Sequence, residues 1–128
     1  MLITTPISLG ELLDKISILI IKDKKITDIE KKQHIVKELT SLYEALDKLI
    51  SRDKVKEYIE NLISINTKLW NIEDDIRNCE RKKQFDQIFI KLARSVYFTN
   101  DKRANIKLNI NEKFGSELIE VKSYEKYS

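Results

Sequence analysis

The sequence has few of the residues that break regular structure, bind metals or form disulfides. Two glycines and one proline in 128 residues are too few for a β-sandwich or any fold with many tight turns. One cysteine and one histidine allow no internal disulfide and supply too few ligands for a catalytic zinc or di-iron site. The single cysteine, Cys79, favours a reducing, cytoplasmic environment.

The sequence also lacks the segments that mark membrane proteins and nucleotide enzymes. No apolar run approaches the roughly 20 residues that cross a bilayer, and residues 1–6 have no signal-peptide pattern, so we expect no membrane association. Gly10 and Gly115 stand alone, which excludes a glycine-rich phosphate loop. We find no catalytic signature and expect neither a cofactor nor a metal ion, so the sequence argues against an enzyme.

What the sequence does contain is typical of one globular domain spanning residues 1–128. Apolar residues make up 41% of the chain and charged residues 35%, which is enough for a core and is unlike a disordered chain. The net charge is +3, and the two signs alternate along the chain. Because no basic cluster stands out, we expect no nucleic-acid partner.

Capping signals and helical spacing predict where the first two helices lie. Ser8 and Glu11 form a capping box, and apolar residues follow at helical spacing up to Ile21, before a polar stretch over residues 22–25. This helix is apolar on almost every side, so we expect it at the centre of a bundle. A second capping box, from Thr27 to Glu30, opens a helix whose seam is Ile35, Leu39, Leu42, Leu46 and Leu49.

The second half of the chain predicts two longer helices. In residues 54–83 the apolar side chains recur at alternating intervals of three and four residues, which is a coiled-coil-like period. This helix follows a turn capped by Ser51 or Asp53. We expect it to form an antiparallel hairpin with the preceding helix. Asp86 is the expected N-cap of a last helix that ends at Gly115. Whether this helix breaks at residues 99–101 stays open.

The predicted fold is therefore all-α, a bundle of four or five helices built on a long antiparallel helical hairpin. The tail over residues 116–124 alternates weakly between apolar and polar side chains. A short β-pair between this tail and residues 2–7 is an open alternative to irregular termini.

One polar constellation stands out on the third and fourth helices. Asn66, Trp70, Glu73 and Arg77 share one helical face, and four of the five arginines lie in this half of the chain. Arg suits bidentate contacts with carboxylates and phosphates. The candidate ligand-binding residues are Trp70, Glu73, Asp74, Arg77, Arg94, Asn100, Asp101 and Arg103.

Two interpretations of this constellation compete. It could be a groove between the third and fourth helices that binds an anionic small molecule or a partner's carboxylates. The alternative, which we favour, is a structural network in which Glu73 and Asp74 pair with Arg94 or Arg103 and fix the helix register.

Five segments of the chain form a recognisable pattern: residues 8–16, 69–77, 92–97, 100–103 and 115–118. This pattern, which covers nearly the whole chain, resembles a family of small bacterial proteins catalogued only as a domain of unknown function. It implies no activity, but it includes most of the polar residues singled out above.

We therefore expect a non-enzymatic, cytoplasmic helical interaction or oligomerisation module, whose partner is a second copy or another protein. The alternative is a protein or enzyme that binds an anionic small molecule in the polar groove.

Overall fold

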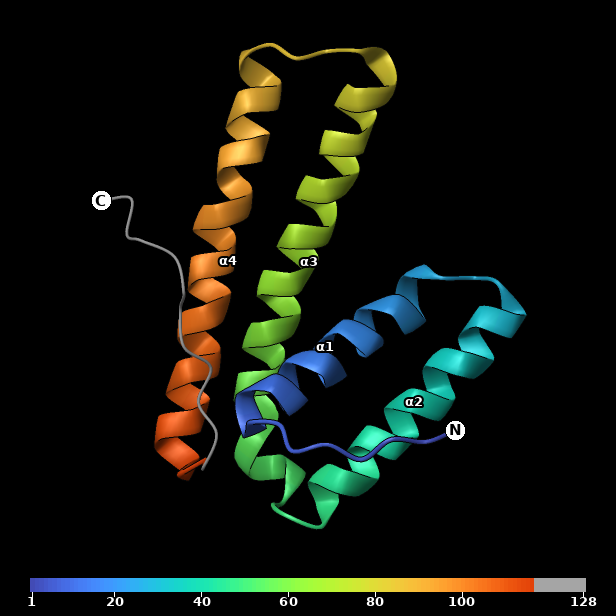
Figure 1. Cartoon of the computed structure of the whole chain (residues 1–128), viewed down its shortest axis with the longest axis vertical. Coiled ribbons are helices and arrows are strands. Elements are labelled where there is room, and N and C mark those ends of the chain that lie inside the picture. Colours follow the sequence, from blue (N-terminus) through green and yellow to red (C-terminus); the bar gives the residue numbers. More distant parts are fainter. Residues whose placement is uncertain (117–128) are drawn as a thin grey trace.

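The computed structural model describes residues 1–116, which form four α-helices and no strand (Figure 1). The helices are α1 (Leu9–Lys25), α2 (Ile29–Asp47), α3 (Arg52–Lys82) and α4 (Gln87–Phe114). The predicted all-α bundle is confirmed. The proposed β-pair is not supported, because residues 2–7 form no strand; its other half lies mainly outside the described residues.

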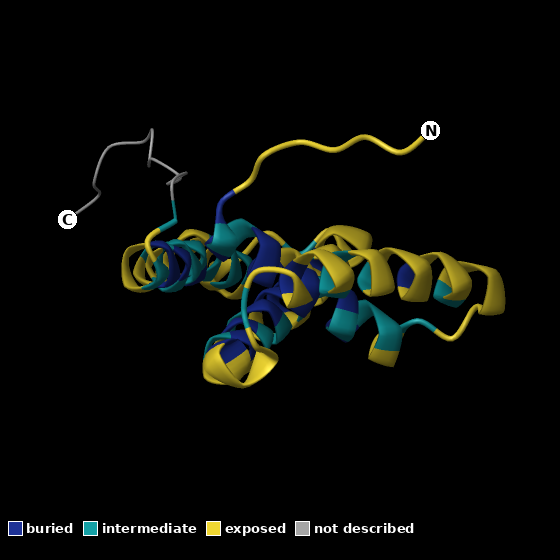
Figure 2. Ribbon diagram, turned by 90° about the horizontal axis from the view of Figure 1, so that it is seen from below, coloured by how far each residue is buried: buried dark blue, intermediate teal, exposed yellow. Residues whose placement is uncertain are grey.

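Helix α1 lies at the centre of the bundle, as its sequence predicts. It packs against α2, α3 and α4, and Leu13 and Ile16 are fully buried. Figure 2 shows the buried residues gathered in the middle of the molecule, with exposed residues around them. The Ser8 hydroxyl accepts a hydrogen bond from the Glu11 amide at 3.1 Å, so the predicted N-cap is confirmed.

The long antiparallel hairpin is present, but it is formed by α3 and α4. The expected hairpin of α2 and α3 is wrong: the two helices diverge from their short connection, and each packs on α1 (Figure 1). The seam of α2, with Ile35 and Leu46 buried, is covered mainly by α1. A helix that is apolar on most sides needs neighbours all round, and this requirement outweighs the short turn.

Local signals fix most helix ends. The N-cap of α2 is Asp28, which accepts from the Lys31 amide at 3.0 Å, so the expected cap at Thr27 is off by one residue. Asp86 caps α4 as predicted. Helix α4 runs unbroken through residues 99–101 and ends at Gly115, whose φ of +65° is the left-handed conformation that glycine adopts easily.

The α3–α4 hairpin projects beyond α1 and α2 as a two-helix arm (Figure 1). We define the arm as residues 71–100 and the base as the rest of the described chain. The end of α1 marks the boundary, because the Lys25 ammonium lies 5.9 Å from the centre of the Trp70 ring. None of the helices in the described part of the chain has the length and apolar character to cross a membrane.

Candidate functional site

The centre of the base holds a fully buried carboxylate, that of Asp14. It accepts a hydrogen bond from Asn66 Nδ2 at 2.9 Å and a bidentate pair from the Arg103 guanidinium, with Nε at 3.0 Å. Asn66 Nδ2 also lies 2.9 Å from Ser17 Oγ, which donates to the Asp14 carbonyl at 2.7 Å. Since a buried charge is tolerated only when it is paired and hydrogen-bonded, α1, α3 and α4 are locked together at this point.

A second set of polar contacts ties the first turn of α1 to α4. Glu11 and Lys107 form an ion pair at 2.7 Å, and the Gly10 amide donates to Asn111 Oδ1 at 2.7 Å. The helices approach so closely that a Cβ on Gly10 would lie 2.6 Å from the Lys107 carbonyl oxygen. The free amides of a helix N-terminus need partners, and here α4 supplies one. We call Glu11, Asp14, Ser17, Asn66, Arg103, Lys107 and Asn111 the polar clamp.

The clamp contains only one of the eight candidate residues, Arg103. Its carboxylate partner comes from Asp14 on α1, whereas the sequence suggested Glu73 or Asp74 on α3. An ion pair between helices is therefore present, but it joins different helices from those expected. The reason is that α1 is short and central and packs against both long helices, so that a carboxylate on α1 contacts both of them.

The α3 candidates lie on the outer surface. Glu73 pairs with Arg77 along α3 at 3.6 Å, and both side chains are more than half exposed. Asp74 is exposed, and Trp70 is half-buried beside Lys25 of α1. These four side chains follow one edge of α3 rather than converging on an enclosed site.

The other α4 candidates lie on the arm and at its junction with the base. The Arg94 Nε donates to the Tyr97 hydroxyl at 3.3 Å, and its guanidinium lies 5.8 Å from the centre of the Phe98 ring. Asn100 and Asp101 are half-buried where the arm meets the base. Arg94 is therefore occupied with neighbours on its own helix.

Sequence reasoning missed most of the clamp. Its signal was present in α1, where Asp14 and Ser17 interrupt an otherwise apolar surface, and in α3, where Asn66 takes a buried position between Leu62 and Leu69. A polar residue at a core position requires a buried polar partner. That rule identifies the residues but not the partners.

A separate apolar cavity of about 780 Å³ opens beside α1 and α2, under the N-terminal segment 2–8. Its walls include Leu9, Leu12, Leu42 and Phe114, and among the residues that the structure describes Lys15 is the one charged residue in its lining. This volume lies within the range of small-molecule pockets.

Two exposed carboxylates outside the clamp have perturbed pKa values. The pKa of Asp47 is lowered because Arg52 donates to it, through Nε at 2.9 Å and Nη2 at 3.0 Å. The pKa of Asp86 is lowered by hydrogen bonds from the Gln84 side chain and from the first amides of α4. Both groups stabilise helix ends, at the α2–α3 turn and at the start of α4.

Comparison with known proteins places the chain in a family without assigning a function. A family model described as a family of unknown function, DUF6165, matches residues 3–127. No curated protein and no solved structure matches the chain. The resemblance noted in the sequence is thus confirmed over nearly its whole length, and the protein belongs to the DUF6165 family.

Proposed function

We propose that this protein is a non-enzymatic, cytoplasmic helical interaction module, in which a rigid base presents the arm to another protein. The observation that carries this proposal is the exposed apolar tip of the arm. Phe85, Ile88 and Ile90 are 53%, 58% and 45% exposed, and they lie close together in the sequence where α4 begins. The free thiol of Cys79 agrees with a reducing compartment.

The tip is suited to binding because part of it is already ordered. The rings of Phe85 and Phe89 pack edge to face, with centroids 5.3 Å apart. A pre-packed aromatic pair loses little conformational freedom when a partner covers it, and aromatic residues are enriched among those that dominate binding energy. Two helices alone leave such side chains exposed, since no third helix among residues 1–116 covers the end of the hairpin.

The alternative, an anionic small molecule bound between α3 and α4, has less support. Arg103 is engaged by the buried Asp14, and Arg77 is paired with Glu73. An anion bound there would have to displace these carboxylates, and the cost of breaking the buried pair is high.

Site-specific photo-cross-linking in living cells tests the interaction function. A photoreactive residue replaces Ile88 at the tip or, as a matched control, Val36, an apolar residue of α2 that is 49% exposed. We expect a discrete cross-linked product from position 88 and none from position 36. The proposal fails if both positions give the same products, or if position 88 gives none.

A further inference from the structure

The outer face of the arm carries a charge pattern that is complementary to itself. Six α3 residues occupy this face at helical spacing, and all are exposed: Asn71, Asp74, Asp75, Asn78, Arg81 and Lys82. The acidic pair precedes Asn78 by three and four residues, and the basic pair follows it at the same separations. The face is therefore acidic on one side of Asn78 and basic on the other.

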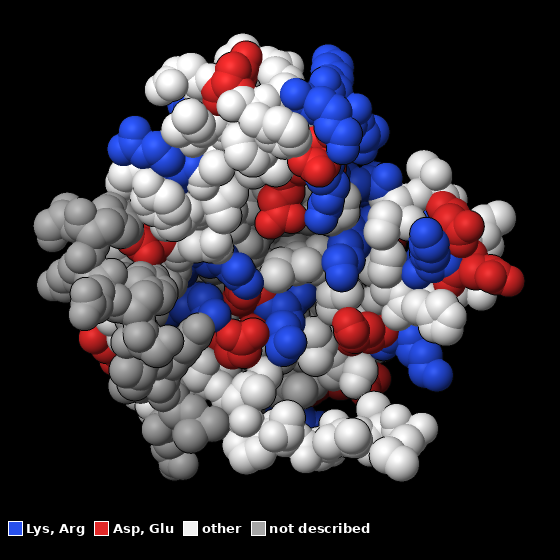
Figure 3. Space-filling view, turned by 45° about the horizontal axis from the view of Figure 1, so that its top comes forward, with Lys and Arg blue, Asp and Glu red and all other residues white. Residues whose placement is uncertain are grey.

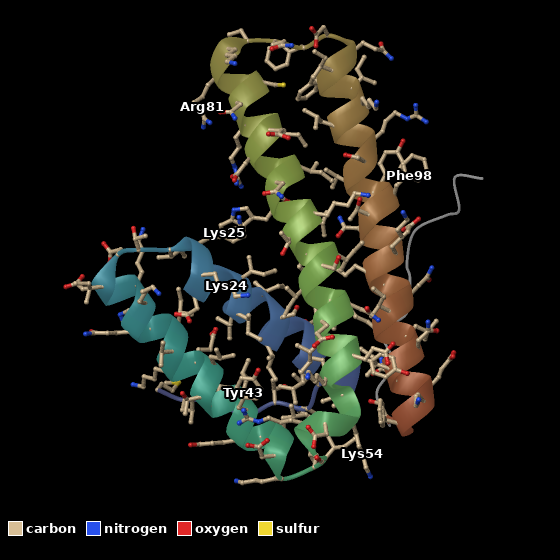
Figure 4. The ribbon with its side chains drawn as sticks, turned by 180° about the vertical axis from the view of Figure 1, so that it is seen from behind. Lys24, Lys25, Tyr43, Lys54, Arg81 and Phe98 are labelled. Atoms are coloured by element: carbon tan, nitrogen blue, oxygen red, sulfur yellow. The ribbon has the colours of Figure 1, made fainter. Side chains whose placement is uncertain are left out.

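The charged side chains of this face have few partners within their own chain. In the described part of the structure, Asp74, Asp75 and Lys82 form no ion pair, and Arg81 donates to the amide oxygen of Asn78. Figure 4 shows Arg81 on the edge of α3 that is turned away from α4. In the upper part of Figure 3, where the arm comes toward the viewer, Lys and Arg side chains gather beside acidic ones.

We propose that the partner of the arm is a second copy of this chain, bound antiparallel through this face with the two-fold axis at Asn78. The inference rests on the interaction function proposed above and names its partner. In this arrangement Asp74 faces the partner's Lys82, and Asp75 faces the partner's Arg81. Two-fold symmetry repeats both contacts, which gives four ion pairs. A parallel arrangement in the same register would instead place like charges together.

The length of the arm fits this register. Residues 71–82 span about 18 Å at 1.5 Å per residue, so pairing at Asn78 brings the tip of each arm to the level where the other copy's base begins. Trp70 is half-buried at that level, and Lys25 lies close to α3 there (Figure 4). The exposed ring of Phe85 would thus be covered by the partner's Trp70.

The two kinds of contact have different roles. Exposed ion pairs each add little to affinity, but opposite charges fix orientation and register and suppress wrong pairings. The apolar tip supplies the buried surface. A complex of this kind weakens as salt screens the charges.

Charge reversal tests the arrangement by sedimentation velocity of the full chain. The variant Asp74→Lys/Asp75→Lys has an entirely basic face, and Arg81→Asp/Lys82→Asp has an entirely acidic one. We expect each variant alone to be monomeric and their equimolar mixture to form a heterodimer. The matched control, Glu57→Lys/Glu60→Lys, reverses two exposed charges on α3 in the base and should dimerise like the wild type. Circular dichroism checks that each variant keeps its helix content.

Salt provides a second readout. The dissociation constant of the wild-type dimer should rise at least about tenfold from low to high ionic strength. The proposal is overturned if the wild type stays monomeric at every concentration, or if the two charge-reversed variants fail to associate when mixed. A monomeric wild type that still cross-links through position 88 to a different protein refutes the second copy and leaves the interaction function standing. Absence of both self-association and cross-links refutes both.

Discussion

Replacing Asp14 with alanine tests whether the polar clamp holds the base together. The Asp14 side chain is fully buried and accepts hydrogen bonds from two partners, Asn66 and Arg103. Its removal leaves the Asn66 amide and the Arg103 guanidinium without their shared acceptor. Breaking a buried ion pair by removing one partner typically costs about 3–5 kcal/mol.

The exposure of Arg103 determines where in the range of about 3–5 kcal/mol the loss of unfolding free energy falls. Its side chain is 28% exposed, so its charge can partly rehydrate when Asp14 is gone, and the lower end, about 3 kcal/mol, is expected. For a domain of this size, 1 kcal/mol shifts the melting temperature by about 3–5 °C, so the midpoint should fall by about 10–15 °C. Differential scanning calorimetry measures both quantities.

Two controls separate the clamp from a general effect of losing charge. Glu44→Ala removes an exposed carboxylate of α2 and should change the free energy of unfolding by less than about 0.5 kcal/mol. The double variant Asp14→Ala/Arg103→Met should cost less than the sum of the two single variants, because each single change already removes the shared contact. The reasoning fails if Asp14→Ala costs less than about 1 kcal/mol or if the two changes are additive.

Three further predictions follow from the packing and the caps. Gly10→Ala should destabilise the protein by about 1–3 kcal/mol despite the better helix propensity of alanine, because the new Cβ would lie 2.6 Å from the Lys107 carbonyl oxygen. Thermal unfolding measures this change. A variant more stable than the wild type would contradict the close approach of α1 and α4. Leu46 is fully buried, so Leu46→Ala should lower the free energy of unfolding in urea by about 2–5 kcal/mol. Leu49 is 73% exposed, so Leu49→Ala should lower it far less. Equal losses for the two variants would place the core elsewhere. The folded pKa of Asp86 lies below the ordinary aspartate value of 3.8, so its contribution to stability is present above that value and is lost as the pH falls through the folded pKa. The melting temperatures of the wild type and Asp86→Ala should therefore differ at neutral pH and converge in acid, and a constant difference would rule out this cap effect.

Short-range features were predictable from the sequence because their determinants lie within one helical turn. The N-caps Ser8 and Asp86 each contact amides two or three residues away, and Gly115 ends α4 through its own backbone conformation. The central position of α1 was also predictable, since a helix that is apolar on most sides must be surrounded. The Thr27 capping box misled because Asp28, the next residue, is an equally good cap.

Long-range pairings were not predictable in the same way. The sequence indicated a long hairpin but not which helices form it, because the short α2–α3 turn is compatible with both antiparallel packing and divergence. Asp14 meets Asn66 and Arg103 across 52 and 89 positions of sequence. Such contacts depend on how three helices cross, which the periodicity of each helix alone does not determine.

The central claim is that the outer face of the arm binds a second copy of this chain. Disulfide trapping at the proposed two-fold axis tests this claim most directly. With two helix axes about 10 Å apart, facing residues on the axis have Cα atoms within the range a disulfide spans. We expect Asn78→Cys to form a covalent dimer rapidly under mild oxidation. The control Asn61→Cys, an exposed position of α3 in the base, should stay monomeric, as should the wild type with its buried Cys79. Equal cross-linking at positions 78 and 61, or none at position 78, would contradict the account.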